Sequence, residues 1–211
     1  QRQMCIRDRI TIIDYGMGNL GSVQNMLKRI GTLSVVTSDI NEIEKAEKIL
    51  LPGVGAFDAA VKKIDELNLR TVLKYKALEQ KVPFLGICLG MQLLTRRSEE
   101  GVLKGLNFVD AQTVKFNFGN DASLKIPHMG WNFVKENKQS ELTKGFTPDY
   151  RFYFVHSYKV VCDKSESSIL RTNYGGEFDS AIQNGNIFGA QFHPEKSHKY
   201  GIHLLTNFSK I

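Results

Sequence analysis

The sequence predicts an α/β fold in which a mostly parallel central sheet is covered by helices on both faces and extended by antiparallel strands. Three observations predict it. Within about the first hundred of the 211 residues, short apolar runs alternate with amphipathic helical stretches. After Gly101, strand-like runs follow one another with turns between them. A helical pattern then closes the chain.

The first predicted unit is a strand over Ile10–Asp14 followed by a glycine-rich turn and a helix. We expect Ser22 to cap this helix and Gly31 to end it. Its apolar residues recur at the spacing of one helix face: Val23, Met26, Leu27 and Ile30.

The turn itself, Gly16-x-Gly18-x-x-Gly21, matches the dinucleotide-binding fingerprint. That fingerprint also needs an acidic residue about twenty positions later, after a second strand, and Asp39 following Leu33–Val36 is the candidate. We keep a nucleotide site as the weaker alternative, because this short pattern recurs by chance.

Two further strands follow, over Lys48–Leu51 and Phe84–Ile87, with a Pro-Gly-x-Gly turn after the first. Helices are predicted from the spacing of Phe57, Ala60, Val61 and Ile64, and over Leu69–Glu79. Ligands of parallel sheets collect beyond the carboxyl ends of the strands. Three segments should therefore meet at one edge: Asp14–Gly18, Pro52–Gly55 and Cys88.

The second half reads as strands joined by turns, so we expect antiparallel pairing there. Gln183–Asn186 is a strong hairpin signal. The closing helix should bury Tyr200, Leu204, Leu205 and Phe208. The predicted strands are Val114–Phe116, Trp131–Val134, Arg151–Val155, Tyr158–Val161, Ile169–Leu170, Ser180–Ile182 and Ile187–Phe192.

Cys88 stands at the junction of a strand and a helix, between Gly86 and Gly90. This Gly-x-Cys-x-Gly pattern is typical of the strained turn that presents a nucleophile. The glycines let the backbones approach closely. The helix N-terminus favours a thiolate, and the N–H of Leu89 should face a developing oxyanion. The alternative is that Cys88 is an ordinary buried hydrophobic residue.

His193 is the candidate base, because it ends an apolar strand and precedes Pro194 and Glu195. Residues i and i+2 of an extended chain share a face, so Glu195 can orient the ring of His193. Together with Cys88 they predict a nucleophile, a base and an orienting carboxylate.

The composition excludes several classes of function. The net charge of +6 is spread over scattered lysines without interleaved aromatic residues, so no nucleic-acid site is predicted. No apolar run reaches the roughly 18 residues that a membrane span needs. The three cysteines, Cys5, Cys88 and Cys162, form neither a disulfide framework nor a zinc spacing, and we expect no metal and a cytoplasmic location.

Two motifs, Gly86-Ile-Cys-Leu-Gly-Met-Gln92 and Gln191-Phe-His-Pro-Glu195, resemble the triad motifs of class I glutamine amidotransferases. Five others resemble the glutaminase subunits of imidazole glycerol phosphate synthase: Asp14-Tyr-Gly-Met-Gly-Asn-Leu20, Pro52-Gly-Val-Gly55, Pro127-His-Met-Gly-Trp-Asn132, Phe154-Val-His-Ser-Tyr158 and His193-Pro-Glu-Lys-Ser197. The resemblance runs from about Ile10 to the end. It implies a flavodoxin-like three-layer sandwich over residues 10–211 as a single domain. We expect residues 1–9, which fit nothing after them, to be a non-native extension.

The resemblance further implies glutamine hydrolysis by Cys88, His193 and Glu195, without a cofactor. It implies an oxyanion hole from the N–H of Leu89 and one from the Gly53–Val54–Gly55 strand, with Val54 the central residue. The implied glutamine-binding residues are Gly53, Gly55, Gln92, His156, Ser157 and Tyr158. Ammonia would pass to a (β/α)₈ cyclase subunit in a heterodimer, through a face that carries Asn19, Met129, Trp131 and Lys196. Three of these residues also have plainer interpretations. Met129 and Trp131 could be core residues, and Lys196 could be an ordinary surface lysine.

Two stretches depart from the family pattern, Arg96-Arg97 and Ser197-His-Lys-Tyr-Gly201. The second is more similar to a paralogous branch that supplies ammonia to sugar amidotransferases of surface polysaccharides. That branch is therefore an alternative for the ammonia acceptor. A non-catalytic scaffold subunit is the alternative from another class, and the intact triad residues argue against it.

Overall fold

The computed structural model describes residues 9–119 and 124–211. The expectation that residues 1–9 are an extension therefore lies outside the described residues, apart from Arg9. Arg9 forms an ion pair with Glu42, with 3.3 Å between Nη2 and Oε2. None of the helices in the two described ranges combines the length and apolar character needed to cross a membrane.

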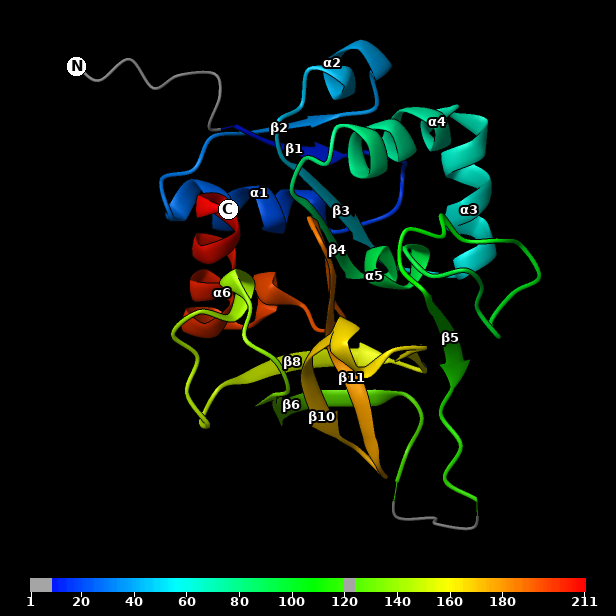
Figure 1. The fold of residues 1–211 in the computed structure, drawn as a ribbon, viewed down its shortest axis with the longest axis vertical. Coiled ribbons are helices and arrows are strands. Elements are labelled where there is room, and N and C mark those ends of the chain that lie inside the picture. Colours follow the sequence, from blue (N-terminus) through cyan, green and yellow to red (C-terminus); the bar gives the residue numbers. More distant parts are fainter. Residues whose placement is uncertain (1–8, 120–123) are drawn as a thin grey trace.

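A parallel sheet forms the centre of the molecule (Figure 1). Its strands are β2 (Ser34–Thr37), β1 (Ile10–Ile13), β3 (Ile49–Gly53), β4 (Phe84–Cys88) and β12 (Ile187–Ala190), in that spatial order. Each neighbouring pair runs parallel, including β4 with β12. On this side β12 has a parallel partner from the first half of the chain, in addition to the antiparallel pairing predicted for the second half.

Helices cover both faces of this sheet, as predicted. Along β1, Ile10 and Ile12 pack on one face with α1 (Leu20–Arg29) and α6 (His198–Lys210), whereas Ile13 packs on the other with α3 (Phe57–Glu66) and α4 (Leu69–Lys74). The alternation follows from the two-residue period of a strand. Smaller helices are α2 (Ile40–Glu44) and α5 (Leu89–Leu93), and one π-helical turn, Tyr75–Glu79, continues α4.

The antiparallel extension begins at β12, which forms a hairpin with β11 (Glu177–Asn184) through the predicted turn. Gly185 in that turn has φ +58, a conformation that glycine adopts without strain. β11 also pairs with β10 (Ser168–Asn173) and with β9 (Tyr158–Cys162). β10 in turn pairs with β7 (Lys135–Glu136), and β9 pairs with β5 (Ala111–Lys115). A separate two-stranded sheet joins β6 (His128–Phe133) to β8 (Arg151–His156).

One local prediction is wrong. The first helix begins at Leu20 after Asn19, so Ser22 lies inside the helix and does not cap it. Asp39, the acidic candidate of the weaker nucleotide alternative, has a local role instead. Its carboxylate caps α2, accepting hydrogen bonds from the backbone N–H groups of Asn41 and Glu42 at 2.7 and 3.3 Å.

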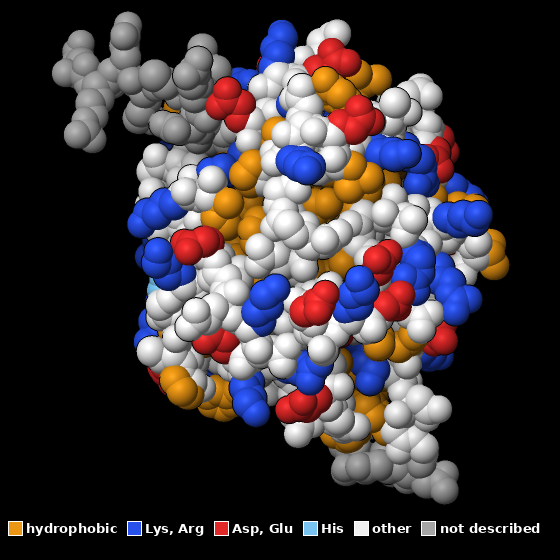
Figure 2. Space-filling model, viewed as in Figure 1, with side chains coloured by type: hydrophobic (Ala, Val, Ile, Leu, Met, Phe, Trp, Pro, Cys, Tyr) orange, Lys and Arg blue, Asp and Glu red, His pale blue; other side chains and the backbone are white. Residues whose placement is uncertain are grey.

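Charges on the outer surface are mixed in sign. Figure 2 shows lysine and arginine side chains interleaved with aspartate and glutamate over the viewed face. This agrees with the scattered charge pattern of the sequence, and that face offers no single-sign patch of the kind that binds nucleic acid.

Candidate active site

Cys88 is held in a strained turn between β4 and α5. Its backbone has φ 53° and ψ −109°, a left-handed conformation that a non-glycine residue rarely adopts. A Cβ on Gly86 would lie 2.6 Å from the Gly90 carbonyl oxygen, and a Cβ on Gly90 would collide with the carbonyl oxygen of Leu51. The predicted need for glycine on both sides of Cys88 is confirmed.

The neighbouring strand brings a second segment to the sulfur. The register of β3 and β4 places Gly53 directly opposite Cys88. Tyr15 is fully buried behind this segment and donates a hydrogen bond of 2.8 Å to the Pro52 carbonyl. Burial and the nearby Cys88 both raise the pKa of the Tyr15 phenol, which therefore stays protonated and remains a donor. The ends of β1, β3 and β4 thus meet at one edge, as predicted.

His193 and Glu195 lie together beside this edge. The ring Nδ1 of His193 is 2.8 Å from Oε1 of Glu195, and each side chain is only 2 % exposed. The predicted reach of Glu195 back to the ring is confirmed. Pro194–Lys196 form a 3₁₀ turn rather than an extended chain, and this turn brings the carboxylate to the ring.

The backbone of His193 is tied to strand β8. Its N–H donates to the Tyr153 carbonyl at 2.9 Å. The buried hydroxyl of Ser197 donates to the His193 carbonyl at 2.6 Å and accepts from the Tyr153 N–H at 3.0 Å. These bonds fix the backbone from which the imidazole projects toward the cavity.

The electrostatic surroundings favour a protonated His193. Burial lowers its pKa, but interactions with Cys88 and Glu195 act in the opposite direction and raise the pKa to about 10. Nε2 is buried and has no hydrogen-bond partner in normal geometry among the described residues. It is thus free to exchange a proton with a group entering the pocket.

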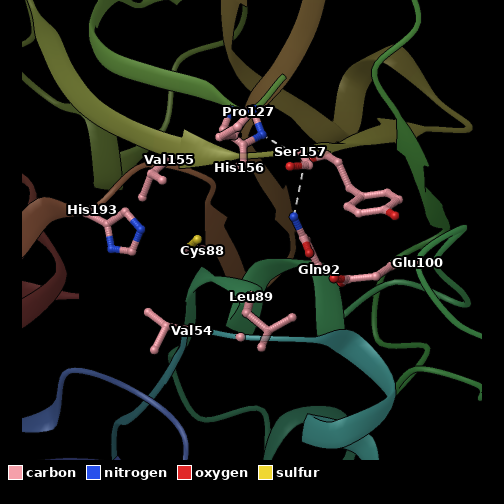
Figure 3. A pocket seen from close by; sticks show the side chains of 12 residues that line it. Val54, Cys88, Leu89, Gln92, Glu100, Pro127, Val155, His156, Ser157 and His193 are labelled. Carbon is pink, nitrogen blue, oxygen red and sulfur yellow. Dashed lines mark hydrogen bonds between the residues drawn. The ribbon is translucent and has the colours of Figure 1, made fainter. Parts of the chain in front are cut away.

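A cavity of about 310 Å³ opens in front of Cys88 (Figure 3). Both Cys88 and His193 point into it, and Gln92 and Glu100 lie at its other end. Most predicted substrate-site residues line this cavity: Val54, Gly55, Leu89, Gln92, His156, Ser157 and Tyr158. Gly53 is beside Cys88 rather than among the lining residues.

A buried histidine pair supports the far wall of the cavity. His156 Nδ1 lies 2.7 Å from the Tyr158 carbonyl, and its Nε2 lies 2.9 Å from Nδ1 of His128. Desolvation lowers the pKa of His128 to about 4 and that of His156 to about 3. Both rings are therefore neutral at physiological pH. Because a carbonyl only accepts, His156 carries its proton on Nδ1 and His128 donates to it.

The predicted partner-facing residues lie outside the cavity. Met129 and Trp131 are 62 % and 44 % exposed on the same face of β6, so their interpretation as core residues is excluded. The ring centroids of Trp131 and Tyr153 lie 6.3 Å apart. The Lys196 ammonium nitrogen lies 5.7 Å from the centroid of the same Tyr153 ring. Asn19 is exposed at the start of α1.

Three residues of the site were given no role by sequence reasoning. Glu100 lines the cavity and is anchored by the Phe57 N–H at 3.0 Å. Tyr15 supports the Pro52 carbonyl, and Gln191 contacts Cys88. Of these three, only Gln191 could have been found by sequence spacing. It lies two residues before His193, as His193 lies two residues before Glu195, and residues at this spacing share a face of an extended chain.

No group of three or more histidine, cysteine, aspartate or glutamate side chains within the described ranges is arranged to hold a metal ion. The arrangement can instead perform nucleophilic chemistry. It joins a sulfur atom, a protonated imidazole and an orienting carboxylate at the end of a cavity of amino-acid size.

Known proteins share this arrangement of elements. The family that matches residues 11–211 is described as glutamine amidotransferase class-I. Among solved structures, PurLQS of Thermotoga maritima has a TM-score of 0.68 at 20 % identity, covering 96 % of this chain and 97 % of its own. A glutamine amidotransferase of Thermotoga maritima has a TM-score of 0.64 at 18 % identity, covering 96 % and 82 %. These two likenesses concern the fold alone.

Curated relatives are much more similar in sequence. Imidazole glycerol phosphate synthase subunit HisH 2 of Methanococcus maripaludis is 52 % identical over 201 residues, which are 95 % of this chain and 98 % of the relative. The protein of the same name from Pseudomonas aeruginosa is 45 % identical over 96 % of this chain and 99 % of its own. Subunit HisH of Bdellovibrio bacteriovorus is 46 % identical over 96 % of this chain and its whole length. The chain therefore belongs to the class I glutamine amidotransferases and, within them, to the HisH subunits of imidazole glycerol phosphate synthase.

Proposed function

We propose that this chain hydrolyses L-glutamine to glutamate and ammonia and delivers the ammonia to a (β/α)₈ cyclase partner. The partner uses it to make imidazole glycerol phosphate and aminoimidazole carboxamide ribotide in histidine biosynthesis. One observation carries the proposal: His193 lies between Glu195 and the cavity that holds Cys88, within a family of glutamine amidotransferases. The reactive thiol is consistent with a reducing cytoplasm.

The reaction has two stages. The Cys88 thiolate attacks the side-chain carbonyl carbon of glutamine, and His193 donates its Nε2 proton to the leaving nitrogen as the C–N bond breaks. Ammonia leaves and a thioester remains. His193 then takes a proton from water as the water attacks the thioester, and the C–S bond breaks to release glutamate and the thiolate. Glu195 holds the ring orientation through both stages.

The cavity suggests how glutamine lies. Its carboxamide meets Cys88 beneath the N–H of Leu89 and the Gly53–Gly55 strand, the proposed oxyanion hole. Its α-carboxylate faces the backbone of residues 156–158, and Gln92 lies alongside. The carboxylate of Glu100 at the far end suits the α-ammonium group.

The partner face is proposed to include Met129, Trp131, Asn19 and Lys196. Exposed large apolar side chains next to a cation are typical of a protein interface.

The decisive experiment mixes the chain with a histidine-pathway cyclase and its nucleotide substrate, and follows glutamate release. We expect release to depend on Cys88 and to be lost in Cys88→Ala. Glutamine-dependent synthesis that survives in Cys88→Ala would indicate a scaffold subunit. Stimulation only by a sugar amidotransferase partner would assign the ammonia to the alternative acceptor.

Regulation by the partner is proposed to act through the Pro52–Gly55 strand, where a peptide flip would complete the oxyanion hole. Val54 is 43 % exposed and lines the cavity, which supports a role for this segment next to the substrate. Val54→Pro removes the N–H that such a flip would present. We expect this variant to lose stimulation by the partner's ligand, and unchanged stimulation would exclude the mechanism.

A further inference from the structure

The side chain of Gln191 is fully buried and points at the nucleophile. Its Nε2 lies 3.7 Å from the sulfur of Cys88, within the hydrogen-bond range for sulfur. The reaction stages described above use Cys88, His193 and Glu195 and leave Gln191 without a role. A buried amide beside a reacting atom therefore needs an explanation of its own.

The Tyr158 carbonyl determines which end of the Gln191 amide faces the sulfur, through two successive hydrogen bonds. The Tyr158 carbonyl can only accept, so the Gln92 amide must present its NH₂ group there, at 3.2 Å. The same Nε2 lies 3.1 Å from Oε1 of Gln191 and donates to it. Gln191 must therefore turn its own NH₂ group toward the sulfur, because turning the amide over would set two NH₂ groups against each other.

Both hydrogens of the Gln92 amide are used in this chain, and the Tyr158 carbonyl is shared with His156 at 2.7 Å. The donor that faces the sulfur is thus fixed before substrate arrives. A fixed N–H in a buried site favours the anion over the neutral thiol, because a bond to a charged acceptor is stronger.

The other groups that face the sulfur come from separate elements. His193, between β12 and α6, presents its ring from one side, and Tyr15, after β1, presents a phenol whose hydrogen is already given to Pro52. Glu195 lies behind the His193 ring. Gln191 is thus the side-chain amide donor at Cys88 among the described residues.

We infer that Gln191 is a catalytic residue that holds the Cys88 thiolate by a directed hydrogen bond, with its orientation set through Gln92 by the Tyr158 carbonyl. The consequence for turnover rests on the proposed glutaminase function. The consequence for the reactivity of the sulfur does not, and it can be measured without glutamine.

The test compares Gln191→Met, which keeps the length of the side chain but removes the donor, with wild type. Carboxamidomethylation of Cys88 by iodoacetamide is followed by peptide mass spectrometry over the pH range in which thiols titrate. We expect the midpoint of the pH–rate profile to move up by about one unit, so that the rate falls roughly tenfold at any pH below the wild-type midpoint. Glutaminase kcat should fall by a similar factor, with KM for glutamine little changed.

Gln183→Met is the matched control, because Gln183 lies on β11 of the same hairpin and its amide donates to the Gly185 carbonyl. Its alkylation profile should match wild type. Gln191→Leu is the second variant, in case Gln191→Met does not fold. It also removes the donor without adding a charge, and it should shift the midpoint upward by a similar amount.

A Gln191→Met profile that coincides with wild type in a folded chain overturns the inference. The same holds for Gln191→Leu. A shifted profile in a protein that hydrolyses no glutamine with its loaded partner leaves the inference standing and removes the proposed function instead.

Discussion

The two buried histidine sites of this protein differ in the direction of their pKa shifts. His193 is 2 % exposed and has a raised pKa, whereas His128 and His156 are 3 % and 5 % exposed and have lowered pKa values. Burial by itself disfavours the imidazolium in all three. The partners decide the outcome, since His193 faces a carboxylate and a thiol, while His128 and His156 face each other among aromatic rings.

The difference separates two tasks within one cavity. In the proposed reaction, His193 on the charged side moves protons. The neutral pair supports the cavity wall formed by residues 156–158, and its tautomers are fixed by the Tyr158 carbonyl. The two sites also respond to pH in opposite directions.

The largest effect is expected from removing the charge that distinguishes the first site. Glu195→Gln keeps the shape, but its amide is a much weaker partner for an imidazolium. Its NH₂ group also gains no bond, because Oε2 of Glu195 has no partner among the described residues. Glutaminase kcat should fall roughly 10²- to 10⁴-fold, measured as glutamate release with the partner loaded. A loss below threefold would contradict the orienting role of Glu195.

A smaller effect is expected from breaking the neutral pair. His128→Leu leaves Nε2 of His156 without its donor and should lower the free energy of unfolding by about 1–3 kcal/mol. His128→Gln can still donate and is the matched control, with a smaller loss. Urea denaturation at neutral pH measures both. Equal stability of the two variants would show that the donor contributes nothing.

The third effect is in the pH dependence of stability. An unfolded histidine binds its proton near pH 6.5, whereas folded His128 and His156 bind theirs only near 4 and 3. The unfolded state therefore holds more protons below pH 6.5, and stability should fall as the pH drops. His128→Gln should reduce this slope by up to about one proton, or ~1.4 kcal/mol per pH unit. An unchanged slope would exclude His128 as a contributor.

The parallel half of the fold could be predicted in detail because its signals are local. Hydrophobic spacing gave α1, α3 and α6, and the glycines around Cys88 gave the turn. The two-residue strand β7 carries no such signal, because both of its residues are exposed. The predicted Ser22 cap is wrong because the helix starts at Leu20, three residues before its first buried apolar residue, Val23.

The site was predictable as far as its short motifs reach. Gly-x-Cys-x-Gly and His-x-Glu gave the reacting residues, and the fold brought them together. The link from Gln92 to Gln191 spans 99 residues, and Glu100 reaches the cavity through a bond to the start of α3. Such pairings depend on the assembled fold and leave no mark at fixed sequence spacing.

The charge of His193 is the most direct test of the account. Nuclear magnetic resonance of ¹⁵N-labelled histidine side chains, assigned with His193→Gln and His128→Gln, reports the protonation of each ring as the pH is varied. The account predicts that His193 stays protonated well above neutral pH and releases its proton near pH 10. The free energy of unfolding should fall as this proton is released. His128 and His156 should stay neutral throughout that range. A His193 ring that is already neutral at pH 7 would contradict it.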